Sequence, residues 1–399
     1  MTLGFDLKRA REIIILAAPI VIAMVTQMGI NVLDTVFVGK LDPTIATPGQ
    51  AALGFGLPLL WAFGGSIAAI GIGTQVMTAR RFGSGDELAA GSIMTNAVVV
   101  ALSSSLVMSA LAVLLVDDLF RFFTTDQSII DLGIPYAQIR IIGIISMVTT
   151  TAIKGFFDGV GRTRIHMYAA LMMNVTNIIL NYVFIFGFGP IPSYAVTGAG
   201  IASTISTFVG LAMIIGFTFS PITRPYSLYN PKNINGRTMW ELIKLSVPSG
   251  LAQLFIMSGV LMFLTIISSL DDQAISTTLG ALSHYSDSSL TAMVGVHEAM
   301  RLSPELARPA MLHDWGSVIL HSRPPMFAAG AKVIIDLLSL GFVTTIAFGT
   351  ATATLVSQSM GRGKFRLAAN YGWDSVKLGM YFYGGLGLLV MLFPSPFLD

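Results

Sequence analysis

Residues 13–38 read IIILAAPIVIAMVTQMGINVLDTVFV, and this run decides the fold of the N-terminal part of the chain. A helix that crosses the hydrocarbon core of a bilayer needs about 20 apolar residues, so the run is long enough to span it. Its only charged side chain is Asp34. A carboxylate within a membrane helix costs about 2.5–3.5 kcal/mol on insertion scales and usually has a function. The run therefore predicts a membrane-spanning helix with a functional acid.

The composition of the whole chain also indicates a membrane protein. Hydrophobic residues make up 54% of the 399 positions and charged residues only 11%, with a mean hydropathy of +0.75. Soluble domains carry about 25% charged residues. The net charge of +2 is too small to indicate a nucleic-acid partner, so the lipid bilayer is the expected surrounding. The absence of cysteine excludes disulfides, thiolate chemistry and cysteine-based metal sites.

Long apolar runs with few charges predict about nine helices. They lie at about 13–38, 52–79, 92–116, 132–157, 166–188, 197–219, 240–269, 333–358 and 370–393. The runs show no alternation of apolar and polar residues, which argues against a barrel. The first run lacks a small-residue cleavage site and is predicted to be retained. We therefore expect an all-α, multi-pass membrane protein.

Basic residues in the loops predict the orientation. If the helices alternate, one side receives these residues: Lys8, Arg9, Arg11, Arg80, Arg81, Lys154, Arg162, Arg164, Arg224, Lys232, Arg237, Arg362, Lys364 and Arg366. The opposite loops hold Lys40 and Arg121 with several acids. The positive-inside rule then places the N-terminus in the cytoplasm, in a plasma membrane of the bacterial inner-membrane type. The turn from Asp158 to Arg164 is interpreted as part of this topology signal.

The chain repeats itself. At an offset of 229, a first set of residues matches a second: Leu16, Pro19, Ala23, Met28, Leu41 and Asp42 match Leu245, Pro248, Ala252, Met257, Leu270 and Asp271. At an offset of 278, Gly71, Thr74, Gly83 and Gly85 match Gly349, Thr352, Gly361 and Gly363. Helices one to three therefore resemble helices seven to nine. An even number of helices per unit makes this a parallel repeat.

The repeat predicts the domain organisation. Residues 1–219 form a first lobe of six helices, 220–239 a cytoplasmic linker, and 240–399 a second lobe of which helices seven to nine are present. The change of offset places an insert of 49 residues at about 283–331. The insert is polar, and it holds His284, His297, His313 and His321 without the close spacing of metal ligands. We expect no metal site there, and we expect the second lobe to be incomplete at the C-terminus.

Several motifs resemble those of the multidrug and toxic compound extrusion (MATE) transporters. They are Asp34-Thr35-x-x-Val38-Gly39, Gly73-Thr74 with Phe82-Gly83-Ser84-Gly85, Gly155 to Arg164, Asn177-x-x-x-Asn181, Gly198 to Ser203, and Leu355-Val356-Ser357-Gln358. Their order, spacing and duplication carry the resemblance, which covers about 10–282 and 332–393. It implies two six-helix lobes around a central cleft and drug efflux driven by Na⁺ or H⁺.

The spacing of polar residues predicts a cation site in the first lobe. Gln27, Asn31 and Asp34 share one helix face, and Asn174, Asn177 and Asn181 share a face of the fifth helix. A carboxylate with amide oxygens suits Na⁺ or a proton better than a transition metal. The alternative is that the amides only join helices, at about 0.6 kcal/mol each. Asn174 and Gln27 are also candidates for the substrate cleft.

The resemblance refines this site. Asp34 matches the family's first-helix aspartate, and Asn177 an asparagine of the proton-coupled branch. Asn181 stands where that branch has an aspartate, and Ser203 where it often has threonine. The Na⁺-coupled branch has a seventh-helix glutamate, but this chain has Ile256 there. The predicted coupling site is therefore confined to the first lobe: Asp34, Gln27, Asn31, Asn177, Asn181 and Ser203.

We expect a monomeric antiporter, not an enzyme, that exports drugs or organic cations in exchange for H⁺ or Na⁺ and holds no cofactor. No nucleotide-binding loop of the GxxxxGK[ST] kind occurs, so ATP is not the direct energy source. One alternative is a lipid-linked precursor flippase of the same superfamily. Such a protein more often has several basic residues inside its helices, and here only Lys154 and Arg140, near predicted helix ends, approach that. Another alternative is a non-functional, partial transporter.

Overall fold

A computed structural model of the chain describes residues 6–124, 126–282 and 326–392. Most of these residues are helical, and β-structure among them is limited to an isolated bridge between Phe188 and Ile191. The all-α prediction is therefore confirmed. The chain divides into two compact units, Met1–Ser258 with Leu340–Asp399 and, separately, Gly259–Ser339. The predicted insert at 283–331 falls outside the described residues except for its end, because a helix already begins at Met326.

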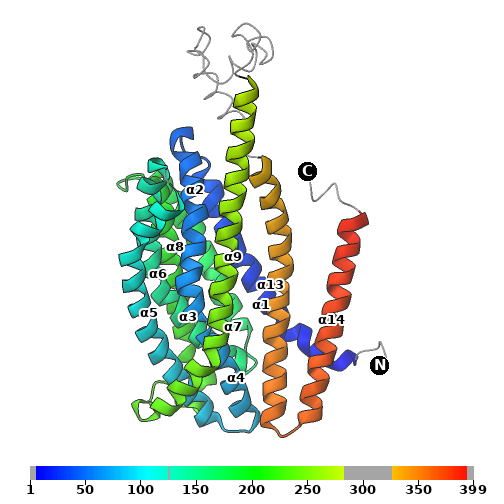
Figure 1. Cartoon of the computed structure of the whole chain (residues 1–399). Coiled ribbons are helices and arrows are strands. Elements are labelled where there is room, and N and C mark those ends of the chain that lie inside the picture. Colours follow the sequence, from blue (N-terminus) through cyan, green and yellow to red (C-terminus); the bar gives the residue numbers. More distant parts are fainter. Residues whose placement is uncertain (1–5, 125, 283–325, 393–399) are drawn as a thin grey trace. The chain divides into compact units, whose positions relative to one another are not determined.

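Figure 1 shows the helices in sequence order. They are α1 Leu7–Val38, α2 Pro43–Leu60, the π-helical turn η1 Trp61–Gly65, α3 Ser66–Ala68, α4 Ile70–Gly83, α5 Glu87–Phe123, α6 Gln127–Gly159, α7 Arg164–Phe186, α8 Ala195–Thr218, α9 Gly236–Leu282, α13 Met326–Gly361 and α14 Phe365–Leu392. Each predicted helix is present. Most are longer than their apolar runs, because polar residues continue the helix beyond the hydrocarbon core.

Seven of the described helical segments are long and apolar enough to cross a membrane. They are Leu7–Val38, Pro43–Gly83, Glu87–Phe123, Gln127–Gly159, Arg164–Phe186, Ala195–Thr218 and Gly236–Phe263. The second of them is interrupted: Pro58 lies just before the π-helical turn at Trp61–Gly65. Proline removes a backbone donor, and a neighbouring π-turn is one way in which a membrane helix accommodates that loss. The protein is therefore a multi-pass membrane protein.

Aspartates at four helix starts explain where the long helices begin. Asp6, Asp42, Asp86 and Asp126 each accept a hydrogen bond from a backbone N–H in the first turn of the helix that follows. These N–H groups have no partner inside the helix, so a carboxylate at the N-cap stabilises the start by about 0.5–2 kcal/mol. The caps lie outside the apolar runs and leave the membrane segments uninterrupted.

Helix α6 is central to the bundle of α1–α8, which we call the first lobe. It packs against α2, α4, α5 and α8, while α1 packs against α7. Glycines allow the close approach of α4 to α6: a Cβ on Gly155 would strike the carbonyl of Gly71, and a Cβ on Gly159 would lie 2.8 Å from the carbonyl oxygen of Gln75. Small residues at such crossings are typical of membrane helices. The tight packing fixes the depth at which α6 places its polar side chains.

The segment 220–239 is folded against the beginning of α5. It forms the short 3₁₀ turns Pro221–Tyr226 and Pro231–Asn233. The amide of Asn96 donates to the carbonyl of Asn233 at 2.8 Å, and its oxygen accepts from the backbone of Asn235 at 2.8 Å. The division of the chain into a first lobe, this linker and a second lobe stays a prediction.

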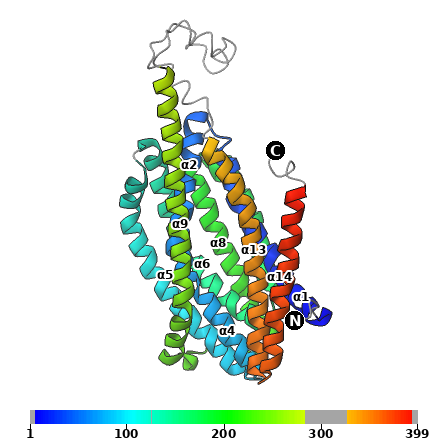
Figure 2. The same cartoon turned by 45° about the vertical axis from the view of Figure 1, so that its right-hand side comes forward.

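Helices α13 and α14 pack on the first lobe near the start of α1 and the ends of α4 and α6. Gln75 donates to the carbonyl of Thr350 at 2.7 Å, and Gln358 donates to the carbonyl of Gly159 at 2.8 Å. Arg9 and Asp374 form an ion pair at 2.6 Å, and Figure 2 shows α14 beside the start of α1. The ion pair between Arg9 and Asp374 joins two residues that are far apart in the sequence. We call this set of contacts the polar seal.

Candidate cation-binding site

Asp34 lies on α1 in the interior of the first lobe and is fully buried, with 0% of its surface exposed. Each of its carboxylate oxygens accepts one hydrogen bond. Nδ2 of Asn181 on α7 donates to Oδ1 at 2.6 Å, and the hydroxyl of Ser203 on α8 donates to Oδ2 at 2.7 Å. A buried carboxylate without such donors would be strongly destabilising. Asp34 therefore ties α1 to both α7 and α8.

The two donors are themselves connected, so the four side chains close a ring. Nδ2 of Asn181 also donates to Oδ1 of Asn177 at 3.0 Å, and Nδ2 of Asn177 donates to the hydroxyl oxygen of Ser203 at 3.0 Å. Asn177 and Asn181 are one helical turn apart and so lie on one face of α7. The two hydrogen bonds that Asp34 accepts come from Asn181 and Ser203, the other two side chains of the ring that contact it. Asp34, Asn177, Asn181 and Ser203 are thus brought together where the sequence analysis placed them.

Glycines position α8 within reach of this ring. A Cβ on Gly198 would strike the carbonyl of Phe184 on α7, and a Cβ on Gly200 would lie 3.1 Å from the carbonyl oxygen of Tyr136 on α6. The two glycines thus let α8 approach both neighbours with little space between the backbones. Ser203 follows on the same helix, with its hydroxyl directed at Asp34.

The remaining predicted residues lie outside the ring. Gln27 and Asn31 are half-buried on α1, and no hydrogen bond among the described residues joins either side chain to Asp34. Asn174 is buried, but its amide donates to the carbonyl of Ala170 one turn earlier at 3.0 Å. Their roles in coupling and in a substrate cleft stay predictions.

Arg140 is the residue near the site that sequence reasoning misjudged. It was expected near a helix end, but α6 begins at Gln127, so Arg140 lies well inside the helix and is only 9% exposed. Tyr136 and Arg140 are one turn apart on α6. In the sequence, an arginine one turn after a tyrosine within an apolar run is the pattern that could have indicated a buried polar position on this helix.

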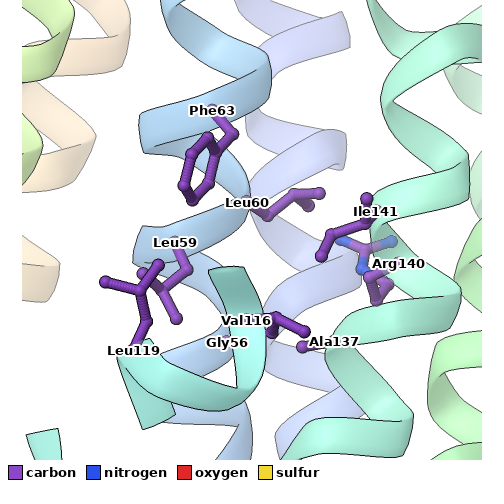
Figure 3. A pocket seen from close by; sticks show the side chains of 9 residues that line it. All are labelled: Gly56, Leu59, Leu60, Phe63, Val116, Leu119, Ala137, Arg140 and Ile141. Carbon is purple, nitrogen blue, oxygen red and sulfur yellow. The ribbon is translucent and has the colours of Figure 1, made fainter. Parts of the chain in front are cut away.

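Arg140 also lines a small cavity between helices. Figure 3 shows it on α6 facing residues of α2, η1 and α5; the lining is Gly56, Leu59, Leu60, Phe63, Val116, Leu119, Ala137, Arg140 and Ile141. The cavity has a volume of about 10 Å³, which is about the space of one water molecule. Nε of Arg140 is buried without a hydrogen-bond partner. The guanidinium is therefore the polar group of an otherwise apolar pocket.

Asp158 is the second buried acid of the first lobe. Asp158 is 1% exposed and belongs to the last turn of α6, while the interpretation of the segment from Asp158 to Arg164 as a topology signal stays a prediction. Nζ of Lys154 lies 3.5 Å from its carboxylate, one turn earlier. Since a charge buried in this way needs a partner, the pair is a packing feature of the helix interior.

The part of the chain that the structure describes contains no group of three or more His, Asp or Glu residues able to hold a metal ion. The four histidines of the predicted insert lie outside the described residues. Within the described part, the candidate site is the ring of Asp34, Asn177, Asn181 and Ser203.

Similar proteins give the same fold. A solved structure of a MOP superfamily transporter from Pyrococcus furiosus is 19% identical and has a TM-score of 0.72. The match covers 98% of this chain and 73% of the Pyrococcus furiosus chain. An outward-facing structure of a multidrug resistance MATE family transporter is 20% identical, has a TM-score of 0.71, and covers 99% and 74%. At this level of identity the likeness concerns the fold.

Curated relatives match in sequence. The "Probable multidrug resistance protein NorM" of Bacillus cereus is 26% identical over 62% of this chain, and that of Thermotoga maritima is 23% identical over 97%. The "FAD transporter" of Shewanella oneidensis is 25% identical over 51%. The chain spans 54% of the Bacillus cereus protein and 71% of the Thermotoga maritima protein. A model of the MatE family matches residues 19–183 and 317–399, more than half of the chain, and the chain belongs to this family.

Proposed function

We propose that this chain is part of a secondary active antiporter that exports drugs or other organic cations in exchange for H⁺ or Na⁺. The observation that carries the proposal is the buried carboxylate of Asp34, held by the ring of Asn181, Asn177 and Ser203. An acid inside a membrane protein is expensive to bury and usually marks an ion pathway. The relatives named as multidrug resistance proteins support the substrate class.

The ring offers a way for ion binding to change the helix packing. In the geometry described above, both carboxylate oxygens of Asp34 accept hydrogen bonds. A proton on Oδ1 displaces the donor that points at it, so the amide of Asn181 must turn. Oδ1 of that amide is buried without a partner, and turning brings it to the proton. The turn also breaks the bond from Asn181 to Asn177, so proton uptake alters the contacts between α1 and α7.

A bound Na⁺ would act on the same groups through a different interaction. It would withdraw the carboxylate oxygens from their two donors and would require further oxygen ligands, because a hard cation prefers several oxygens. The half-buried Asn31 and Gln27 on α1 are the nearest candidates along the same helix face. In either case the ion changes which groups on α7 and α8 hold α1.

Transport also requires that the cleft opens to one side at a time. The polar seal joins α13 and α14 to the first lobe through Arg9–Asp374, Gln75–Thr350 and Gln358–Gly159. By the positive-inside rule this end faces the cytoplasm. We propose that these contacts close the cytoplasmic side in one state and separate in the other. The proposal includes a plasma-membrane location, a cytoplasmic N-terminus and a monomeric protein.

One observation favours a second candidate, a flippase or transporter of an anionic, lipid-linked or nucleotide-like substrate. Arg140 and Lys154 both lie inside α6, and basic groups there suit phosphate-bearing substrates. The relative named "FAD transporter" supports this alternative. Lys154 is already paired with Asp158, which leaves Arg140 as its main support.

The proposal is tested with the full chain in proteoliposomes. A cationic dye such as ethidium is placed inside, and a gradient of pH or of Na⁺ is imposed across the membrane. We expect dye movement against its concentration gradient with one of the two gradients and none without a gradient. Absence of gradient-driven movement of ethidium, with movement of flavin adenine dinucleotide instead, would support the second candidate and contradict the first.

A further inference from the structure

We propose that a pocket between α1, α13 and α14 binds the headgroup of a phospholipid that carries a phosphate and a primary ammonium group, as phosphatidylethanolamine does. The pocket has a volume of about 280 Å³, and none of its lining residues belongs to the ring around Asp34. It borders the polar seal, because Gln358 contributes to both. The proposal requires only that the chain lies in a membrane, so it does not rest on the proposed transport.

The pocket contains one acidic and one basic side chain that are not paired with each other. Glu12 on α1 and Arg362 just after the end of α13 both line it, and the ion pairs among the described residues include neither. The hydroxyl of Tyr371 on α14 donates a hydrogen bond to Oε2 of Glu12, which holds the carboxylate at the pocket wall. Opposite charges in one pocket match a zwitterion, whose phosphate accepts from the guanidinium while its ammonium donates to the carboxylate.

A buried hydroxyl also lines the pocket without a partner. Ser359 is 2% exposed, and no hydrogen bond in the described part of the chain involves its side chain. A buried polar group that lacks a partner is unfavourable, so an acceptor that enters the pocket stabilises it. A phosphate oxygen is such an acceptor, and Arg362 three residues later adds positive charge to the same wall.

The polarity of the lining changes with depth in the way that a phospholipid requires. Helix α1 enters the membrane from its N-terminal end, so Glu12 lies nearer the membrane surface than Ile15 and Leu16. On α13 the order is reversed, because Leu355 precedes Arg362 by about two turns and α13 ends near the start of α1. Both helices therefore place a charged lining residue near the surface and apolar lining residues deeper.

The acyl chains have a path outside the pocket. Small-molecule sites typically have about 300–1,000 Å³, so the volume of about 280 Å³ suits a headgroup and not a whole lipid. Ile15 is 50% exposed, and Ile22, two turns deeper on the same face of α1, is 45% exposed. An acyl chain that leaves the pocket along α1 covers these two side chains.

The test is native mass spectrometry of the purified full chain, stripped of lipid and titrated with one phospholipid at a time. We expect one molecule of phosphatidylethanolamine to bind at least about tenfold more tightly than phosphatidylcholine or phosphatidylglycerol with the same acyl chains. The quaternary ammonium of phosphatidylcholine donates no hydrogen bond, and phosphatidylglycerol has no cation. Equal binding of the three lipids by the wild-type protein would overturn the proposal without any variant.

Variants assign the two charges. Glu12→Gln should lower the affinity for phosphatidylethanolamine by about tenfold and leave that for phosphatidylglycerol unchanged, because only the ammonium loses its partner. Arg362→Gln should weaken all three phosphate-bearing lipids, and Arg362→Lys should retain them. Glu87→Gln and Arg366→Gln are the matched controls, since they remove exposed charges outside the pocket and should bind lipid as the wild type does. Indistinguishable lipid affinities for Glu12→Gln and Glu87→Gln would contradict the assignment.

A soluble headgroup identifies the source of the ligand. Glycerophosphoethanolamine at the same concentration should not displace the lipid, because it has no acyl chains to cover α1. Displacement would show that a free zwitterion is the ligand and would overturn the assignment to a lipid. Lipid binding is measured without a gradient or a drug, so its failure leaves the proposed transport standing, and a failure of transport leaves the lipid site standing.

Discussion

Gly83 and Gly361 occupy equivalent positions of the repeat, and each lies against the other's helix. A Cβ on Gly83 would strike the carbonyl of Gln358 on α13, and a Cβ on Gly361 would strike the carbonyl of Arg80 on α4. Arg80 and Gln358 are themselves separated by the repeat offset of 278. The contact is therefore reciprocal, as expected for two copies of one motif that meet across a pseudo-twofold axis.

We predict that Gly361→Ala opens the contact between α4 and α13, the helices that the Gln75–Thr350 contact of the polar seal also joins. The added methyl group meets backbone that cannot move aside without separating α4 from α13. Since the chain has no cysteine, a single cysteine at Ala351, which is buried against α1 and α14, reports the opening by its reaction with an impermeant maleimide. Labelling should be several-fold faster in Gly361→Ala. Gly349→Ala, on the same helix in open space, is the control and should label at the wild-type rate.

The ion pair between Arg9 and Asp374 should stabilise the seal. Their side chains are 24% and 6% exposed, so removing Arg9 leaves a nearly buried carboxylate without its partner. Arg9→Gln should lower the free energy of unfolding by about 1–3 kcal/mol, less than for a fully buried pair because Arg9 is partly solvated. Arg237→Gln is the comparison, because Arg237 pairs with Glu241 at exposures of 87% and 52% and should change stability by only about 0–1 kcal/mol.

Thermal unfolding of the purified variants in detergent measures both effects. Adding Asp374→Asn to Arg9→Gln should restore part of the lost stability, since no uncompensated charge remains. Equal losses of unfolding free energy in the Arg9→Gln and Arg237→Gln proteins would show that the Arg9–Asp374 pair stabilises the fold no more than an exposed ion pair does.

The hydroxyl of Ser203 is predicted to hold Asp34 in the ring. Ser203→Ala removes both the bond to Asp34 and the acceptor for Asn177. Hydrogen bonds between membrane helices are worth about 0.6 kcal/mol on average and up to about 1.7, so the loss of two should lower stability by about 1–3 kcal/mol. Ser203→Thr keeps the hydroxyl and should retain both stability and ion-driven transport. Wild-type stability and wild-type transport in the Ser203→Ala protein would contradict a role of Ser203 in the site.

The start of α2 should depend on pH through Asp42. Hydrogen bonds from the hydroxyl and then the backbone N–H of Thr44 hold the pKa of the Asp42 carboxyl below its ordinary value of 3.8. A carboxyl whose pKa is lower in the folded state stabilises that state above its unfolded pKa, and loses this contribution as the pH falls through the folded value. The first turn of α2 should therefore open only below about pH 3.8. Asp42→Asn, which keeps a neutral cap, should abolish this pH dependence of amide exchange in residues 44–46.

The sequence predicted the helices and the centre of the site because both depend on local patterns. Asn177 and Asn181 lie on one face of α7 by spacing alone, and Asp34 is conspicuous in an apolar run. Gln27 and Asn31 share the face of Asp34 as well, but they are two turns and one turn away, where α7 offers them no partner among the described residues.

Packing between distant segments decided the rest. The burial of Arg140 depends on the start of α6, which lies five residues before the apolar run predicted at 132, and on the packing of α6 against α2 and α5. Asp158 is buried because the glycines of α4 and α6 bring those helices into contact, a relationship that no single segment reveals.

The central claim is that Asp34 couples the ion gradient to transport, and counterflow measures this most directly. In proteoliposomes that contain Asp34→Asn, exchange of labelled for unlabelled dye without any gradient should continue, because the cleft and the seal are intact. Accumulation of dye driven by a pH or Na⁺ gradient should be absent in the same vesicles, while the wild-type chain performs both. Gradient-driven accumulation by the Asp34→Asn protein at the wild-type level would contradict the account.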